Sequence, residues 1–267
     1  MASPTVTFTR SRLAVACLAC NASLAFSQSD INDRYTQTPI KHVIVVVGEN
    51  HTFDSLFATY QPAAGRTVDN LLSKQIINAD GTPGVNYALA RQNIARNTGT
   101  TYTLDPERVD PYAVLPRPIL ELGLIDKRFP RNLANGPFQI SDYVPYSGPH
   151  SQTGDPVHRF FQMWQQTGGD NANLDLFVWV AATTGQGGNT PGVFPWRPAQ
   201  GGELMGFSNM ATGDAPYFKA LADSYAMSDN FHQAIMGGTG MNFFSIATGD
   251  LPVYNRDGEL MPPPANQ

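Results

Sequence analysis

The sequence predicts an α/β fold, in which a mostly parallel sheet is flanked by helices. Two apolar runs carry this prediction, at residues 43–47 and 176–180. The first is β-branched throughout and has no polar alternation, which is typical of a strand buried on both faces. The second follows a well-marked helix, and helix–strand units are the building blocks of α/β architecture. With 267 residues, the chain can form one large domain or two small ones.

The composition narrows the classes of function. Hydrophobic residues make up 42% of the chain, which is enough for a substantial core, whereas charged residues make up 15%. The net charge is -5 and there is no basic stripe, so we expect no nucleic-acid partner. Both cysteines, Cys17 and Cys20, lie near the N-terminus. If that segment is removed, oxygen and imidazole ligands are left to hold any metal.

Residues 1–27 are typical of a signal peptide. Arg10 and Arg12 precede an apolar run at 13–26, and small residues follow as a cleavage site. The run is shorter than the roughly 20 residues that a spanning helix needs. We therefore expect a mature chain, residues 28–267, that is secreted or periplasmic and has no transmembrane anchor.

The first strand is predicted to end at a ligand site. Glu49 and Asn50 directly follow its glycine, at the carboxyl edge where parallel sheets bind ligands. Thr52 then caps a helix, with Asp54 in the first turn. The buried stripe of that helix is expected to be Leu56, Phe57 and Tyr60.

Residues 61–155 contain many glycine, proline and asparagine breakers and few periodic stretches. We expect an irregular excursion that decorates the crevice, with one helical turn at 119–125. A helix is then predicted to begin with Asp155 as its cap and Pro156 at its first position, and to end at 168–169. Its apolar stripe is Val157, Phe160, Phe161 and Trp164.

After the second strand we expect a surface loop at 184–213 and two further helices. Asp214 is predicted to cap the first of these, and the second runs from about 240 to 248 and ends at Gly249. The apolar face of the first is Phe218, Leu221, Ala222 and Tyr225.

Thr239 is the most informative single residue. It has two glycines before it and one after it, at the start of a predicted helix, where free N–H groups favour an anion. A hydroxyl there can attack phosphorus, with a nearby metal lowering its pKa. Asn242, one turn along, can donate to the same phosphoryl oxygens. The alternative is that Thr239 is an ordinary helix cap and the glycines only shape a turn.

Histidines supply a second kind of candidate. His158 lies beside the apolar stripe of its helix and can face a cleft, although a helix-surface histidine is an equal alternative. His51 borders the motif at Glu49. The remaining histidines, which we assign to structure or solvent, are His42, His150 and His232.

Three ordered segments resemble the bacterial phosphoesterase family, which contains acid phosphatases and phosphatidylcholine-hydrolysing phospholipases C. Residues 49–54, Glu-Asn-His-Thr-Phe-Asp, resemble the Glu-Asn-Arg-Ser-Phe-Asp signature of that family. Residues 222–231 and 238–242 are similar to its nucleophile segment. The helix expected at 155–166 resembles its histidine-containing helix.

The resemblance implies a fold related to alkaline phosphatase, with a sheet between helices and a metal-supported nucleophile. By position, Thr239 would be the transiently phosphorylated nucleophile, His158 an active-site histidine and Asn242 a phosphate contact. Glu49 and Asn50 would be metal or phosphate ligands. A divalent metal of unspecified identity would thus be held by Glu49, Asn50 and Thr239.

The resemblance also implies what this chain lacks. Family members are longer, and they complete the site with an Asp-Asp pair and further histidines. We therefore expect residues 28–267 to be the N-terminal part of a catalytic domain that is truncated at its C-terminus. The metal site is then expected to be incomplete. His51, Met241 and Phe243 depart from the family pattern. The substrate is therefore left open between a phosphomonoester and a phospholipid. A non-catalytic remnant and a sulfatase-like or phosphonate-cleaving enzyme are the alternatives.

Overall fold

The computed structural model describes most of the chain between residues 37 and 260. The expected signal peptide, Asn50, the expected helix start at Asp155 and Pro156, residues 119–123 and most of the expected loop at 184–213 lie outside the described residues. The chain divides into two units, residues 1–48 and 49–267, and each is described by itself. The described ranges are 37–49, 51–96, 104–118, 124–151, 153, 157–169, 173–184, 208–250, 255–256 and 259–260.

The first unit contains the apolar run on which the fold prediction rested. Residues 40–48 have no regular secondary structure, and Val43 and Ile44 are 77% and 88% exposed. The predicted buried strand at 43–47 is therefore wrong. A strand buried on both faces needs a layer of packed side chains over each face. The side chains of this run are instead exposed.

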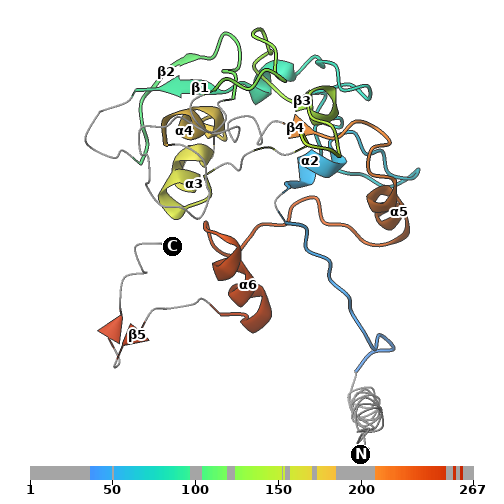
Figure 1. Cartoon of the computed structure of the whole chain (residues 1–267). Helices are drawn as coiled ribbons and strands as arrows, with labels where there is room; N and C mark the ends of the chain where they lie inside the picture. Colours follow the sequence, from blue (N-terminus) through green and yellow to red (C-terminus); the bar gives the residue numbers. More distant parts are fainter. Residues whose placement is uncertain are drawn as a thin grey trace, which may run out of the picture. The chain divides into compact units, whose positions relative to one another are not determined.

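The second unit combines helices with three small sheets, each of two strands (Figure 1). This mixture is compatible with the predicted α/β class. The described residues form no larger sheet, so the alkaline-phosphatase-like sheet is not formed among them. The pairs are β1 (Asn93–Ala95) antiparallel to β2 (Arg108–Pro111), β3 (Phe138–Gln139) parallel to β4 (Ser208–Asn209), and β5 (Asn255–Arg256) antiparallel to β6 (Glu259–Leu260).

The helices begin and end largely at local sequence signals. Thr52 caps α2 as predicted, because its Oγ1 accepts from the backbone N–H of Ser55 at 3.3 Å. Gly168 and Gly249, at φ 80° and 70°, end α3 and α6 in the left-handed conformation that glycine favours. None of the helices in the described residues has the length and apolar character to cross a bilayer. They are α2 (Phe53–Phe57), α3 (Phe160–Thr167), α4 (Phe177–Thr184), α5 (Pro216–Ser224) and α6 (Thr239–Thr248), with short 3₁₀ turns at Tyr87–Ala90 and Ile140–Asp142.

The second predicted strand is a helix. Leu176, Val178 and Val180 are fully buried, as expected, but they lie at the start of α4 or inside it. A short apolar run does not by itself distinguish a buried strand from a buried helix. Here α4 packs against α3 and β1, and Gln92 Oε1 accepts the N–H of Phe177, the first residue of the helix, at 2.8 Å. The buried environment was predicted correctly and the backbone conformation was not.

Two predicted helix starts are also wrong. α3 begins at Phe160, so His158 precedes the helix instead of lying in its first turn, and Phe160 is 50% exposed. α5 begins after Ala215, and Asp214 does not cap it. The Asp214 carboxylate instead accepts from the N–H of Ala211 at 2.9 Å and from the hydroxyl of Ser141 at 3.1 Å, so it is engaged by donors outside the helix.

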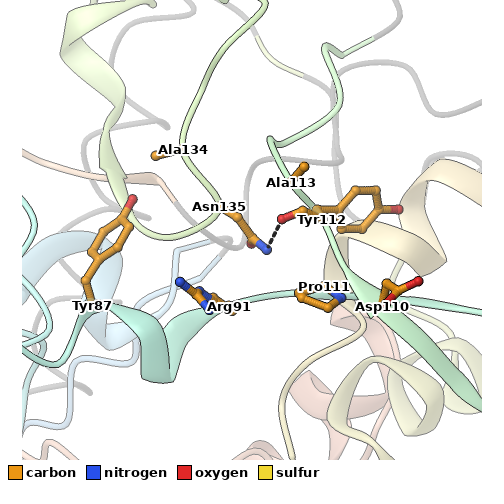
Figure 2. Close-up of a pocket in the computed structure, with 8 residues that line it drawn as sticks. All are labelled: Tyr87, Arg91, Asp110, Pro111, Tyr112, Ala113, Ala134 and Asn135. Carbon is orange, nitrogen blue, oxygen red and sulfur yellow. Dashed lines mark hydrogen bonds between the residues drawn. The ribbon is translucent and has the colours of Figure 1, made fainter.

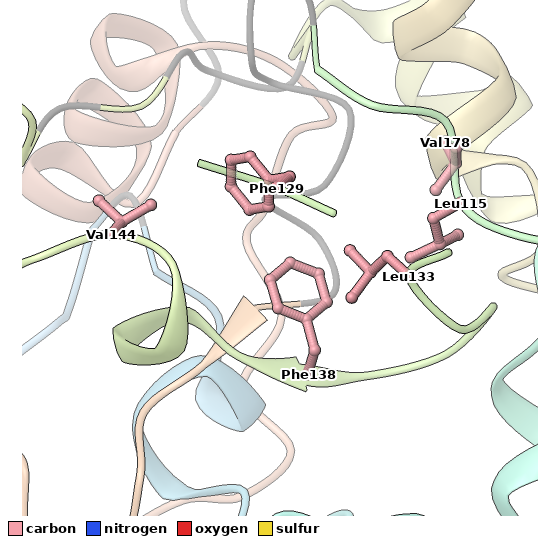
Figure 3. Close-up of a cluster of buried hydrophobic side chains, with 6 residues drawn as sticks. All are labelled: Leu115, Phe129, Leu133, Phe138, Val144 and Val178. Carbon is pink, nitrogen blue, oxygen red and sulfur yellow. The ribbon is translucent and has the colours of Figure 1, made fainter. Parts of the chain in front are cut away.

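The core is built mainly from the irregular stretch at 61–155. A hydrophobic cluster that joins this stretch to α4, seen in Figure 3, places Phe129 edge-on to Phe138, with ring centroids 6.1 Å apart. The stretch therefore forms a core instead of decorating a crevice. The cluster consists of Leu115, Phe129, Leu133, Phe138, Val144 and Val178.

A charged pair ties β2 to the segment before α4. Arg108 holds both oxygens of Asp175, at 3.0 and 3.1 Å, and Asn93 donates to the same carboxylate at 2.8 Å. Burial alone would raise the pKa of Asp175, but the hydrogen bonds from Arg108 and Asn93 outweigh it and the pKa is lowered. The ionised carboxylate therefore stabilises the fold.

We predict that Asp175→Asn lowers the free energy of unfolding by about 1.5–3 kcal/mol at pH 7, because a charge-assisted hydrogen-bonded pair is lost. A lowered carboxyl pKa contributes stability that is present above 3.8 and lost as the pH falls below it, so the difference should vanish in acid. Urea unfolding at several pH values measures this. Asp69→Asn, which removes the exposed 3.3 Å pair with Lys74, is the control and should cost below about 1 kcal/mol. Equal effects of the two variants would contradict the account.

Candidate functional site

Two residues predicted to share a site meet in the structure. α6 begins at Thr239, directly after Gly238, and the threonine side chain is exposed. The hydroxyl of Thr239 donates a hydrogen bond to Oε1 of Glu49, across a separation of 190 residues. The free N–H groups of the first helical turn lie at the same place. A hydroxyl, a carboxylate and a helix N-terminus are thus brought together.

Asn242 lies under this turn and is 6% exposed. Its Oδ1 accepts from the N–H of Ile235 at 3.2 Å, and its Nδ2 lies 3.0 Å from the carbonyl oxygen of the same residue. The carbonyl oxygens of Gly237 and Gly238 lie 3.3 Å from Nδ2, and Oε1 of Gln233 lies 3.1 Å from it. The amide is therefore engaged with the loop before Thr239. The resemblance implied a phosphate contact at this position.

His158 lies next to the same loop. A Cβ built on Gly238 would lie 3.7 Å from Cδ2 of His158 and 4.0 Å from its Nε2. The half-buried imidazole is thus adjacent to the residue that precedes Thr239. Buried Val157 anchors this segment in the core cluster with α4. His158 is placed at the site by the segment before α3, and not by a helical turn.

The remaining predicted residues are less informative. Asn50 lies outside the described residues. His51 pairs with Ser55 through Nδ1 at 2.9 Å, so it borders the site from the start of α2. Gln233 was missed by the sequence analysis. No local pattern singles it out, because it joins the site through a contact with Asn242 that only the folded chain brings about.

The comparison with known families gives one match. The phosphoesterase family matches residues 40–261, a range that includes Glu49, His158 and Thr239. The chain belongs to the phosphoesterase family. No curated protein and no solved structure matches it. Membership confirms the resemblance and supports the hydrolysis of phosphoric esters in general.

The phosphoesterase resemblance implied a divalent metal, and the described oxygens do not suffice to hold one. Glu49 and Thr239 offer a carboxylate and a hydroxyl, which are oxygen donors of the kind that hard cations bind. Such cations take about six or more oxygens. Within the described residues, no three His, Cys, Asp or Glu side chains gather as a metal-binding group.

A pocket of about 610 Å³ lies elsewhere in this phosphoesterase-family chain (Figure 2). Asn135 forms part of its wall and donates to the carbonyl oxygen of Tyr112 at 2.8 Å. None of the predicted site residues lines it. The lining residues are Tyr87, Arg91, Asp110, Pro111, Tyr112, Ala113, Ala134 and Asn135.

Asp54, the last residue of the family signature, has a carboxyl group that is only partly compensated in the fold. Its Oδ1 is buried and has no hydrogen-bond partner among the described residues. Burial raises the pKa of Asp54, and the positive charge of Lys74 offsets part of this effect. A raised carboxyl pKa means that ionisation destabilises the folded state above the ordinary value of 3.8.

We predict that Asp54→Asn unfolds at the same or a higher temperature than the wild-type chain at pH 7. The difference should disappear near pH 3, where the Asp54 carboxyl is protonated in both the folded and the unfolded chain. Thermal unfolding at the two pH values measures it. Asp80→Asn is a control of opposite sign, because hydrogen bonds from Thr82 lower the pKa of Asp80. A lower midpoint for Asp54→Asn at pH 7 would show that its charge stabilises the fold.

Proposed function

We propose that this chain hydrolyses phosphoric esters with Thr239 as its nucleophile. Family membership supports the class of reaction. The hydrogen bond from Thr239 to Glu49 supports the choice of nucleophile, because a hydroxyl needs a base to become one. This contact is the single observation that carries the proposal.

In the first step, Oγ1 of Thr239 attacks phosphorus while its proton passes to Glu49. The Oγ1–P bond forms, the bond from phosphorus to the leaving oxygen breaks, and His158 protonates that oxygen. The N–H groups of the first turn of α6 bind the phosphoryl oxygens. Asn242 holds the loop from which Thr239 projects.

In the second step, water hydrolyses the phosphothreonine. Water gives one proton to His158 and its oxygen bonds to phosphorus, while the Oγ1–P bond breaks. Glu49 returns the first proton to Thr239, so both groups end in their starting states. Metal support, which the resemblance implies, is not part of this proposal because Glu49 and Thr239 supply too few oxygens.

The substrate class follows from the resemblance: a phosphomonoester, as in acid phosphatases, or a phospholipid diester, as in phospholipases C. A signal peptide at 1–27 would deliver the enzyme to the periplasm or the exterior, where both classes of ester occur. The departures at His51, Met241 and Phe243 lie close in sequence to Glu49 or Thr239, so they are candidates for setting the choice between the two.

We predict that Thr239→Ala lowers the hydrolysis of p-nitrophenyl phosphate or p-nitrophenyl phosphorylcholine by roughly 1,000-fold or more, because the nucleophile is lost. Thr239→Ser should retain a measurable rate. Thr248→Ala, the same substitution at the far end of α6, is the matched control. Release of p-nitrophenol by the folded chain that does not depend on Thr239 would sink the proposal, and so would no release at all.

Glu49→Gln should keep an oxygen that accepts from the Thr239 hydroxyl, but the amide cannot act as a base as the carboxylate does. We expect kcat to fall by roughly 100- to 10,000-fold, as for other general bases. The pH profile of kcat/KM should also lose its acidic limb. An unchanged rate and profile would assign the base to another residue.

A further inference from the structure

We propose that Asn242 and Gln233 act together as positioning residues that hold the loop at 233–238, so that Thr239 reaches Glu49. This inference rests on the proposed function where it concerns turnover. It changes the role that the resemblance implied for Asn242, from a contact with phosphate to a contact with protein. It also gives Gln233 a role that no motif predicts.

The burial of Asn242 is the first argument. It is the one buried residue of α6, and asparagine is a poor helix former because its amide competes for backbone groups. Its acceptor oxygen takes the N–H of Ile235, and its amino group lies 3.0–3.3 Å from three loop carbonyl oxygens. An amide whose oxygen and nitrogen both face the loop has no polar atom directed to a substrate.

The absence of apolar anchoring in α6 is the second argument. Phe243, Phe244 and Ile246 are 65%, 56% and 58% exposed, so their burial does not hold this helix in place. Residues 226–238, before the helix, form no regular secondary structure. The contacts of Asn242 therefore have to set the path of the chain into Thr239.

Gln233 completes the arrangement from the other end of the loop. Its Oε1 accepts from Nδ2 of Asn242 at 3.1 Å, while the residue itself is exposed. Only the acceptor oxygen is used in this contact. Gln233→Glu therefore keeps the contact and Gln233→Leu removes it, at nearly the same side-chain size.

Hydrogen–deuterium exchange tests the proposal independently of activity. We expect faster exchange across residues 233–240 in Asn242→Ala and Gln233→Leu, and wild-type exchange in Gln233→Glu. Asn135→Ala is the matched control, because Asn135 is similarly buried and its amide also bonds to backbone groups, in another part of the fold. Loss of the Asn135 amide should leave the exchange rates of residues 233–240 unchanged. Wild-type exchange at 233–240 in Asn242→Ala would overturn the proposal.

Kinetics separate positioning from substrate contact. Gln233→Leu should lower kcat by roughly 10-fold or more with little change in KM, because misplacing a reacting group slows the chemical step. Gln233→Glu should restore the rate. A rise in KM with kcat unchanged in Asn242→Ala would instead make Asn242 a phosphate contact and overturn its positioning role. A wild-type chain without activity would defeat the proposed function, while the exchange result would still decide this proposal.

Discussion

The hydrogen bond between Thr239 and Glu49 spans 190 residues and joins the proposed nucleophile to its proposed base. Closing so long a loop costs conformational entropy, which one hydrogen bond of about 1 kcal/mol cannot offset. The contact therefore depends on a scaffold that brings the two segments close beforehand. In the chain this scaffold consists of the α2 segment, the loop pinned by Asn242, and the core between them in sequence.

Buried amide side chains hold that core together through hydrogen bonds to the backbone. Gln92, which is 2% exposed, bonds through its side chain to the carbonyl oxygen of Leu174 and the N–H of Phe177, and through its backbone to Asn135. Asn70 bridges the carbonyl oxygens of Phe57 and Tyr60 in the same way. Buried backbone groups need partners, and long irregular segments have no sheet ladder to supply them. Buried amide side chains supply those partners here.

Local signals in the sequence were sufficient where the structure depends on neighbouring residues alone. The cap at Thr52, the end of α6 at Gly249 and the start of that helix near Thr239 were predicted within a residue, because turn and cap chemistry act over a few positions. Features decided by distant partners were not predicted. Residues 177–180 became helical next to Gln92, and Asp214 took donors at Ala211 and Ser141.

For the site, the sequence indicated which residues belong together but not how they meet. Family motifs led to Glu49, His158 and Thr239. In the structure the hydroxyl of Thr239 bonds to Glu49, and His158 lies beside Gly238, the residue before Thr239. The role of Gln233 could not be predicted, since it arises from one contact between a loop and a helix.

Trapping of the covalent intermediate tests the central claim most directly. The chain is mixed with a phosphoric ester, quenched in acid within the turnover time, digested and examined by mass spectrometry. The account predicts one added phosphoryl group on the peptide that contains Thr239, and none in Thr239→Ala. Turnover without any phosphorylated threonine, or with the phosphoryl group on another residue, would contradict it.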